Sequence, residues 1–361
     1  MNVLIVTNNP HLPQQYGGSE VSINDLALEF KDFGVDVRVL CGLNNKGLVY
    51  YRNRFLARIT GNAFPADSRL GYISYRGWSA AGAISKGVAN LIKKYKADLI
   101  IVQGAGVIKL ARELVVFNVP IIVSIVDVED PNINGDAPVA DNIVYRANSS
   151  FTAGRVFKKY GITCKVIPPL IRLNKYLTKT VEKYVTFVNP HPYKGCDLVL
   201  DLARRNAHIP FIIQEAWPLT ADYKNRLMSV ISGIPNIQYR EPVVDMKSLY
   251  AVTKILLVPS QYEEAWGRVV NEAQISGIPV IASNRGGLPE AVGDGGLVIE
   301  YDAPVEIWSE ALNSFWSDQE LYRDYSTKAS NRLKSGELSG EFLVKSYLSA
   351  YESIRSCCSG K

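Results

Sequence analysis

Residues 254–287, KILLVPSQYEEAWGRVVNEAQISGIPVIASNRGG, decide the fold. They begin with a short apolar run, 254–259, of the kind that forms a buried parallel strand. After a polar loop, residues 268–276 read as a helix that Gly277 ends. Residues 278–282 (IPVIA) then form a second buried strand. This order of strand, loop, helix and strand predicts an α/β domain built on a parallel sheet.

The predicted chemistry lies where this helix begins. Gly267, Arg268 and Val269 should present backbone N–H groups that the helix itself cannot pair, and the helix dipole favours an anion there. Glu264 precedes the helix and Glu272 lies inside it, so the two carboxylates can flank a bound anion. A carboxylate accepts two hydrogen bonds, which suits a pair of sugar hydroxyls. A nucleotide sugar has this layout of ribose, diphosphate and hexose.

Glu264 and Glu272, with seven residues between them, resemble the signature of the retaining glycosyltransferases of the GT-B fold, family four. The residues that fit the same signature are Ser260, Trp266, Gly267, Gly277, Pro279, Gly286, Gly287 and Glu290. An ordinary α/β unit with two surface glutamates is the alternative. The complete set of residues favours the family, and the structural context has to agree with it.

The resemblance implies an α/β fold of the GT-B type, with two Rossmann-like doubly wound domains that face each other across a cleft. Ligands then bind at the carboxyl ends of the strands. We expect an N-terminal acceptor domain at 1–168, to which a C-terminal helix at 342–361 crosses back. A donor domain for the nucleotide sugar is expected at 169–341.

Length and composition agree with a two-domain protein of the cytoplasm. The chain has 361 residues, more than one simple core usually holds. It has five cysteines, an odd number without metal-binding spacing, which is typical of a reducing compartment. The N-terminal MNVLIVTNN reads as a first strand instead of a signal peptide, and no run is long enough to span a bilayer. The net charge of +5 suits anionic substrates or a membrane surface and gives no reason to expect nucleic acid.

The first half opens with a strand, a loop that contains Gly17 and Gly18, and a helix. It lacks the G-x-G-x-x-G pattern, which argues against a nicotinamide dehydrogenase. In the resembling family, a paired-glycine loop lets the backbone approach the donor phosphate or the acceptor. A plain turn explains the two glycines equally well.

Residues 44–78 are basic and aromatic. This stretch could bind the acceptor or touch a membrane, because arginines and aromatic rings suit sugars, phosphates and lipid headgroups. A solvated helix followed by a half-buried strand is the interpretation that we favour. The residues concerned are Tyr50, Tyr51, Arg52, Arg54, Phe55, Arg58, Phe64, Arg69, Tyr72, Tyr75, Arg76 and Trp78.

An acidic group follows a predicted strand at 120–127 and contains Asp127, Glu129 and Asp130. We expect an acceptor contact for Asp127 and solvation for the other two. Many members of the resembling family carry a histidine just before this aspartate, whereas this chain has Val126.

The second half repeats the strand, loop and helix of the first. Lys194, which precedes Gly195, matches the lysine that the family uses to bind the diphosphate. The family usually has an arginine five residues earlier, where this chain has Asn189, so Arg268 or Arg285 would have to replace that contact. The loop that contains Val243 corresponds to one that contacts the base, largely through the backbone.

The resemblance implies transfer of a hexose from a nucleotide diphosphate sugar, expected to be a UDP-sugar, to a glycan or a lipid-linked acceptor. The anomeric configuration is retained. Lys194 and residues 267–269 hold the phosphates, Glu264 orients the hexose, Glu272 binds the ribose, and Trp266 sets the loop and packs on the sugar. Glu264 and Lys194 are the residues expected to be catalytic, and Asn189 is counted among the nucleotide contacts. Neither a metal nor a cofactor is expected.

Three alternatives stay open. They are a nucleotide-sugar epimerase on the same fold, a dehydrogenase, and a non-catalytic relative that binds nucleotides or glycans. The expected location is the cytoplasm, with the inner face of the membrane as a peripheral site through residues 50–78.

Overall fold

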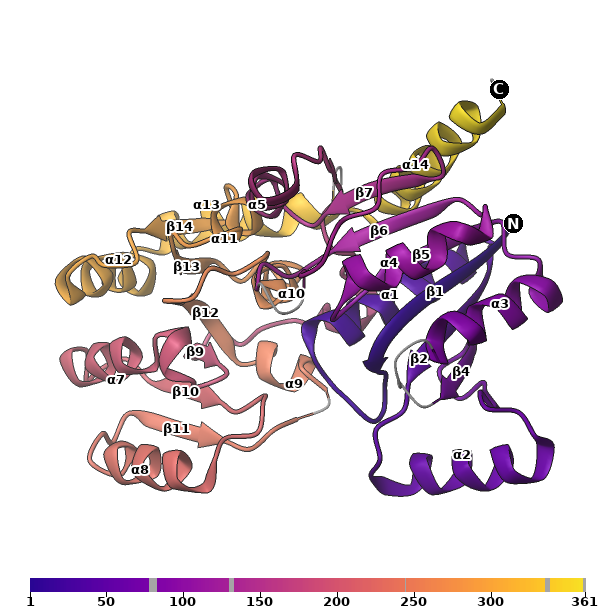
Figure 1. Ribbon diagram of the computed structural model, residues 1–361. Coiled ribbons are helices and arrows are strands. Elements are labelled where there is room, and N and C mark those ends of the chain that lie inside the picture. The colour runs from indigo at the N-terminus through magenta and orange to yellow at the C-terminus, as the bar shows by residue number, and fades with distance from the viewer. Residues whose placement is uncertain (78–82, 130–132, 244, 335–337, 360–361) are drawn as a thin grey trace. The chain divides into compact units, whose positions relative to one another are not determined.

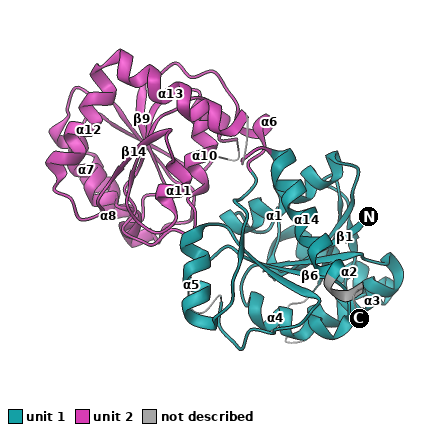
Figure 2. Cartoon of the chain, turned by 90° about the horizontal axis from the view of Figure 1, so that it is seen from above, with its two compact units in different colours: residues 1–170, 340–361 teal, residues 171–339 magenta. Residues whose placement is uncertain are grey.

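The computed structural model describes residues 1–77, 83–129, 133–243, 245–334 and 338–359 (Figure 1). Trp78 and Asp130, named above from the sequence, lie outside the described residues. The chain divides into two compact units (Figure 2). Unit 1 consists of Met1–Leu170 and Gly340–Lys361, and unit 2 is Ile171–Ser339.

Unit 1 is built on a sheet in which, among the described residues, eight strands take the order β3-β4-β2-β1-β5-β6-β7-β8. All neighbouring strands are parallel except β3 and β4, which pair antiparallel at the edge. The strands are β1 Asn2–Pro10, β2 Asp36–Gly42, β3 Ala66–Asp67, β4 Ile73–Gly77, β5 Leu99–Gln103, β6 Ile121–Ile125, β7 Ile143–Ala147 and β8 Lys165–Val166.

Helices cover both faces of this sheet. They are α1 Gly18–Asp32, α2 Gly47–Thr60, α3 Ala83–Tyr95, α4 Val107–Leu114, α5 Ser150–Tyr160 and α14 Gly340–Ser359, with a short 3₁₀ helix, η1 Val115–Phe117. Successive side chains of a strand point to opposite faces. Val3 and Ile5 therefore pack with α1 and α14, while Leu4 and Val6 pack with α3, α4 and α5. A strand that is buried on both faces explains the unbroken apolar runs of the sequence.

The C-terminal helix α14 belongs to unit 1. Leu343, Tyr347, Tyr351 and Ile354 lie in the core that α1 and the sheet form. Phe30 of α1 meets the Tyr347 ring edge-on, with the ring centroids 5.9 Å apart. The apolar face of this helix is therefore part of the core of unit 1.

The basic and aromatic stretch after β2 forms a helix, α2, and then strand β4. A helix and a strand therefore occur as that interpretation predicts, and β4 is more deeply buried than the predicted half-buried strand. In β4, Ser74 and Arg76 are fully buried, and Arg76 Nε lies 3.7 Å from Asp67 Oδ2. Strand β4 is thus part of the body of unit 1.

Unit 2 is built on a sheet whose described strands run parallel in the order β11-β10-β9-β12-β13-β14. The strands are β9 Tyr184–Val188, β10 Phe211–Gln214, β11 Ile237–Arg240, β12 Thr253–Val258, β13 Val280–Ser283 and β14 Gly296–Ile299. The helices are α6 Leu173–Tyr176, α7 Cys196–Arg205, α8 Ala221–Ile231, α9 Lys247–Tyr250, α10 Arg268–Gln274, α11 Leu288–Val292, α12 Val305–Ser317 and α13 Gln319–Lys334, with a 3₁₀ helix, η2 Pro192–Lys194.

The sheet of unit 2 also has a core on each face. Phe187, Phe211 and Trp308 belong to the core under α7, α8 and α12, and Leu256 and Val280 belong to the core under α10, α11 and α13. In neither unit is any described helix both long and apolar enough to cross a bilayer.

Candidate functional site

The candidate site lies at the carboxyl edge of the unit 2 sheet, where the strand order reverses. From β9 the chain builds the sheet outward through β10 and β11, then returns to place β12 on the other side of β9. The loops that follow β9 and β12 therefore diverge above two neighbouring strands. Open α/β sheets bind ligands at such a switch point. Lys194 lies in the first of these loops and Glu264 in the second.

Lys194 and Glu264 meet directly. The Lys194 ammonium forms an ion pair with Glu264 Oε1, and Ser260 Oγ donates to the same oxygen at 3.0 Å. Both side chains of the pair are 14% exposed. A charged pair with this little solvent interacts more strongly than one on an open surface. The two residues predicted to be catalytic are thus brought together, although they are 70 positions apart in the sequence.

Aromatic rings surround the Lys194 ammonium. Nζ lies 5.1 Å from the ring centroid of Trp217, 5.7 Å from that of Tyr262 and 5.9 Å from that of Tyr193. Rings at these distances attract a cation through their quadrupole. Trp217 is 37% exposed and Tyr193 is 42% exposed. Trp217 was not predicted from the sequence, and the available signal was its place directly after the strand β10, at the same edge of the sheet.

Glycines allow the loops of the site to interlock. At Gly195, where φ is +85°, a Cβ would lie 2.1 Å from the Pro259 carbonyl oxygen. At Gly286, where φ is +63°, a Cβ would lie 2.2 Å from the carbonyl oxygen of Glu264. That oxygen accepts a hydrogen bond from the N–H of Gly287 at 2.7 Å. The backbone of Glu264 is therefore held by the loop after β13. The position of its carboxylate depends on the close approach of the loops that Gly195 and Gly286 allow.

Helix α10 begins beside this pair and ends two residues earlier than predicted. Gly267 precedes it with φ at +94° and ψ at 62°, and the helix ends at Gln274 instead of Ser276. The N–H groups of Ser276 and Gly277 bond back three residues, to the carbonyls of Ala273 and Gln274. Such tighter bonds close the last turn as a 3₁₀-type turn.

Glu272 is 7% exposed, and both of its oxygens have a protein neighbour. Tyr250 donates its hydroxyl to Oε2 at 3.1 Å, and Arg268 Nε lies 3.5 Å from Oε1. Burial, and then the Glu272 charge, raise the pKa of Tyr250 well above its usual value, so this phenol stays a donor. Each carboxylate oxygen keeps a further lone pair that can accept a hydrogen bond.

Comparison with known proteins identifies the family of this unit. Residues 174–332 match the family described as glycosyl transferases group 1. Unit 2 is a group 1 glycosyl transferase domain. Glu264 and Glu272, on which the resemblance was based, lie within the matched range, and so does Lys194.

The curated relatives match this chain over short segments. A D-inositol 3-phosphate glycosyltransferase of Corynebacterium kroppenstedtii is 40% identical over 81 residues, which is 22% of this chain and 18% of the relative. Spore coat protein SA of Bacillus subtilis is 33% identical over 122 residues, 33% of this chain and 32% of the relative. The matched segments thus span a third or less of these two relatives.

Solved structures match over almost the whole chain. A glycosyltransferase from Rickettsia africae is similar with a TM-score of 0.75 at 16% identity, over 98% of each chain. Anabaena HepE in complex with UDP is similar with a TM-score of 0.75 at 17% identity, over 98% of this chain and 100% of the other. This likeness confirms the predicted fold class, an α/β protein of two Rossmann-like, doubly wound units.

Trp266 has a supporting position in the glycosyl transferase domain. Its side chain is 5% exposed and packs in the core beneath α10, and its Nε1 donates to Asn271 Oδ1 at 2.7 Å. A ring this deeply buried has no free face to pack on a sugar, so that part of the prediction is wrong. The other part, that Trp266 sets the loop, agrees with its position directly after Glu264 and Ala265.

Asn189 also differs from expectation. It is 6% exposed with φ at +71°, and its Oδ1 accepts from the N–H of Trp217 at 3.2 Å. Its side chain therefore positions the loop that carries Trp217. Arg285 stacks on Tyr301, with its guanidinium carbon 4.2 Å from the ring centroid. Of the two arginines named as substitutes, Arg268 is the one that lies beside Glu272 at the start of α10.

The remaining predicted residues of the glycosyl transferase domain are Val269 and Val243. Val269 packs partly buried against the core below α10. Val243 is 42% exposed and follows β11, the edge strand that pairs with β10. His191 stacks on Tyr193 with ring centroids 5.1 Å apart, and burial and the Lys194 charge lower its pKa. His191 is therefore neutral at pH 7.

Gly17 and Gly18 belong to unit 1 and not to the glycosyl transferase domain. Gly17 is extended and precedes α1, and a Cβ on it would lie 2.5 Å from Glu20 Oε2. Glu20 is 2% exposed and its Oε1 accepts from Asn9 Nδ2 at 2.8 Å. This polar pair at the carboxyl end of β1 was not predicted from the sequence.

Asp127 uses its carboxylate within its own loop. Oδ1 accepts from the N–H groups of Val128 and Glu129 at 2.7 and 3.0 Å. Among the described residues, no group of three His, Cys, Asp or Glu side chains is arranged to hold a metal ion.

Proposed function

We propose that the protein is a retaining glycosyltransferase that moves a hexose from a nucleotide diphosphate sugar to a hydroxyl of a glycan or lipid-linked acceptor. The observation that carries the proposal is the convergence of Lys194 and Glu264 at the switch point of a group 1 glycosyl transferase domain. A cation and a carboxylate side by side match the two halves of the donor, since its pyrophosphate is anionic and its hexose carries hydroxyl donors.

The ion pair itself suggests how the donor is bound. The pyrophosphate competes with Glu264 for the Lys194 ammonium, because a diphosphate carries more charge than a single carboxylate. As Lys194 turns to the phosphate, Glu264 Oε1 becomes free to accept from a hydroxyl of the hexose. Binding of the charged leaving group and orientation of the sugar are thereby coupled in one exchange of partners.

Arg268 and Glu272 extend the site along α10. Arg268 supplies the second positive charge for the pyrophosphate. It replaces the arginine that the family usually has at the position of Asn189. When Arg268 turns to the phosphate, Glu272 Oε1 can accept from a ribose hydroxyl, while Tyr250 keeps Oε2 in position. The ribose and the hexose are then held by two carboxylates on either side of the phosphates.

The chemical step breaks the bond between the anomeric carbon and the β-phosphate oxygen. A bond from the acceptor oxygen to the same carbon forms on the same face, and the acceptor proton passes to the departing phosphate. Lys194 and Arg268 stabilise the charge that develops on the nucleoside diphosphate. We propose that these cations serve the reaction without a metal ion.

A uridine nucleotide is the donor that we propose. The structures that share this fold include Anabaena HepE in complex with UDP and, separately, with UDP-glucose. The exposed Trp217 and Tyr193 rings beside Lys194 can stack on a base or a sugar, because every base presents a π face.

A panel of UDP-, GDP- and ADP-sugars tests the proposal by thermal shift, since a ligand that binds only the folded protein raises its Tm. The UDP-sugars are expected to give the largest shift, and release of UDP in the presence of an acceptor is expected to follow. A product with inverted configuration by NMR would contradict retention. Release of free sugar or an epimer would favour the epimerase, and no release at all would favour a non-catalytic binding protein.

Glu272→Ala tests the ribose contact. Loss of one charged hydrogen-bond acceptor weakens binding by about 2 kcal/mol, or roughly thirtyfold in the Kd for UDP. Glu310→Ala, an exposed glutamate of α12, is the matched control and should leave the Kd unchanged. Equal UDP affinity of Glu272→Ala and the wild type would contradict the role of Glu272.

A further inference from the structure

Helix α2 of unit 1 has apolar side chains on two opposite faces. At about 100° per residue, Leu48, Tyr51, Phe55 and Ile59 fall on one face. They are 89%, 67%, 64% and 65% exposed, respectively. The buried residues of the helix lie on the other face. We call the four exposed residues the outer stripe.

An outer stripe of this kind is unusual for a helix on a protein surface. Such helices normally turn polar residues to solvent and keep one apolar face for the core. The core-facing side of α2 is already occupied, because Val49 and Asn53 are buried in unit 1. From Leu48 to Ile59 the outer stripe is about 16 Å long. Its apolar side chains could be covered only by a partner outside this core.

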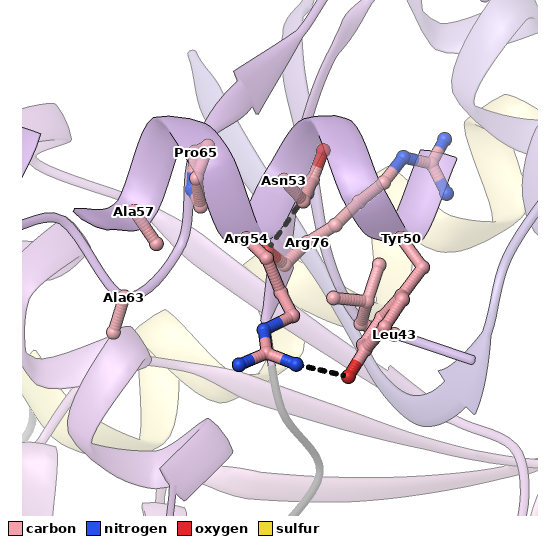
Figure 3. A pocket seen from close by; sticks show the side chains of 8 residues that line it. All are labelled: Leu43, Tyr50, Asn53, Arg54, Ala57, Ala63, Pro65 and Arg76. Carbon is pink, nitrogen blue, oxygen red and sulfur yellow. Dashed lines mark hydrogen bonds between the residues drawn. The ribbon is translucent and has the colours of Figure 1, made fainter. Parts of the chain in front are cut away.

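The inner side of α2 is fixed to the body of unit 1, as Figure 3 shows. Asn53 Nδ2 donates to the Arg76 carbonyl at 3.2 Å, and both residues line a cavity of about 390 Å³. Arg54 turns back toward the same cavity, where its Nη1 donates to the Tyr50 hydroxyl at 3.1 Å. These contacts determine which face of α2 points outward.

The charges around the outer stripe indicate the chemistry of its partner. Residues 43–66 contain four basic residues, Lys46, Arg52, Arg54 and Arg58, and no Asp or Glu. On the helical wheel, Arg52 lies on one side of the stripe and Arg58 on the other. Both are exposed. Long basic side chains at the borders of an apolar face can place their stems on lipid chains and their charges at the headgroups.

We propose that α2 lies flat on an anionic membrane surface. The outer stripe enters the boundary between headgroups and acyl chains, while Arg52 and Arg58 bind lipid phosphates. A helix with an apolar face, basic borders and no acidic residue is typical of an interfacial helix. This inference does not depend on the catalytic proposal, because lipid binding by unit 1 needs no donor.

Co-sedimentation of the full chain with vesicles tests the proposal. Wild-type protein should bind mixed phosphatidylglycerol–phosphatidylcholine vesicles and bind pure phosphatidylcholine much more weakly. Arg52→Gln and Arg58→Gln should each weaken binding to the anionic vesicles about fivefold. Phe55→Ser combined with Ile59→Ser should weaken it about a hundredfold, because two apolar side chains no longer leave water.

Phe157→Ser is the matched control. Phe157 is 59% exposed on α5 of the same unit and is followed by Lys158 and Lys159. This variant should bind the anionic vesicles like the wild type. Thermal melts of all variants should agree with the wild type, since the altered side chains are exposed.

Three results would overturn the proposal. They are equal binding to anionic and neutral vesicles, wild-type affinity in the Phe55→Ser, Ile59→Ser variant, and no binding of the wild type. A wild-type dimer in size-exclusion chromatography that the stripe variant dissociates would assign the stripe to a second copy of the chain instead.

Discussion

Replacing Gly286 by alanine tests how the site holds Glu264. Gly286 lies in the loop after β13 with φ at +63°. A Cβ there would lie 2.2 Å from the carbonyl oxygen of Glu264 and 2.7 Å from its nitrogen. Both contacts are with backbone, so no flexible side chain can move aside.

The size of the effect follows from the two contributions. A left-handed conformation costs an alanine about 1–2 kcal/mol. Ordinary contact with a carbonyl oxygen requires the Glu264 backbone to retreat by about 1 Å, which also disturbs the bond from the Gly287 N–H. The total loss of stability is about 3 kcal/mol. A displacement of about 1 Å at a binding group lowers the rate about a hundredfold.

The assay compares Gly286→Ala with Gly161→Ala. Gly161 has a similar φ of +68° and ends α5 in unit 1, and a Cβ added to it would have no neighbour within 4 Å. Both variants should unfold at lower urea concentration. Sugar transfer and donor binding should fall in Gly286→Ala alone.

A folded Gly286→Ala variant that binds and turns over the donor as well as Gly161→Ala does would refute this reasoning. The loop would then have room that the described backbone does not offer, or Glu264 would not contact the donor.

Two further predictions concern single side chains. Lys194→Met keeps the stem of the side chain but removes its charge, so the rate of sugar transfer should fall about a hundredfold. The control, Lys328→Met on the exposed face of α13, should leave the rate unchanged. A Lys194→Met variant that is as fast as the wild type would remove Lys194 from the mechanism. His11 is fully buried, and burial followed by the Arg76 charge lowers its pKa to about 3. Because the unfolded chain takes up that proton near pH 6.5, stability should fall with acidification below this pH, by about 2 kcal/mol at pH 5. The free energy of unfolding, measured in urea, should differ less between pH 7 and pH 5 in His11→Gln than in the wild type. The same difference in both proteins would contradict the assignment of this pH dependence to His11.

The features that the sequence predicted correctly are those encoded within one short segment. The apolar runs of β12 and β13 give buried parallel strands, and the residues around Glu264 lie on the loop and helix that their order implies. Leu343, Tyr347 and Ile354 recur at helical spacing, and this face of α14 lies in a core. Lys194 could be placed because its loop follows β9, next to β12 in a doubly wound sheet.

The features that the sequence could not predict depend on contacts between segments. Trp217 reaches Lys194 from the loop after β10, and nothing near Lys194 in the sequence encodes that approach. Trp266 read as a sugar contact because residue type does not report burial. Asn189 read as a weakened phosphate contact, whereas its left-handed backbone and its bond to Trp217 follow from the neighbouring strand.

Helix α2 shows a different limit of pattern analysis. Its apolar residues occupy two faces, so periodicity alone cannot tell which face meets the core. The structure resolves this through Val49 and Asn53, which are buried, and leaves Phe55 and Ile59 outside.

A crystal structure of the protein with a bound UDP-sugar tests the central claim most directly. We predict the pyrophosphate within hydrogen-bond distance of Lys194 Nζ, next to the start of α10, with Glu264 on the hexose and Glu272 on the ribose. A nucleotide bound away from both glutamates, with the Lys194–Glu264 ion pair intact, would contradict this claim.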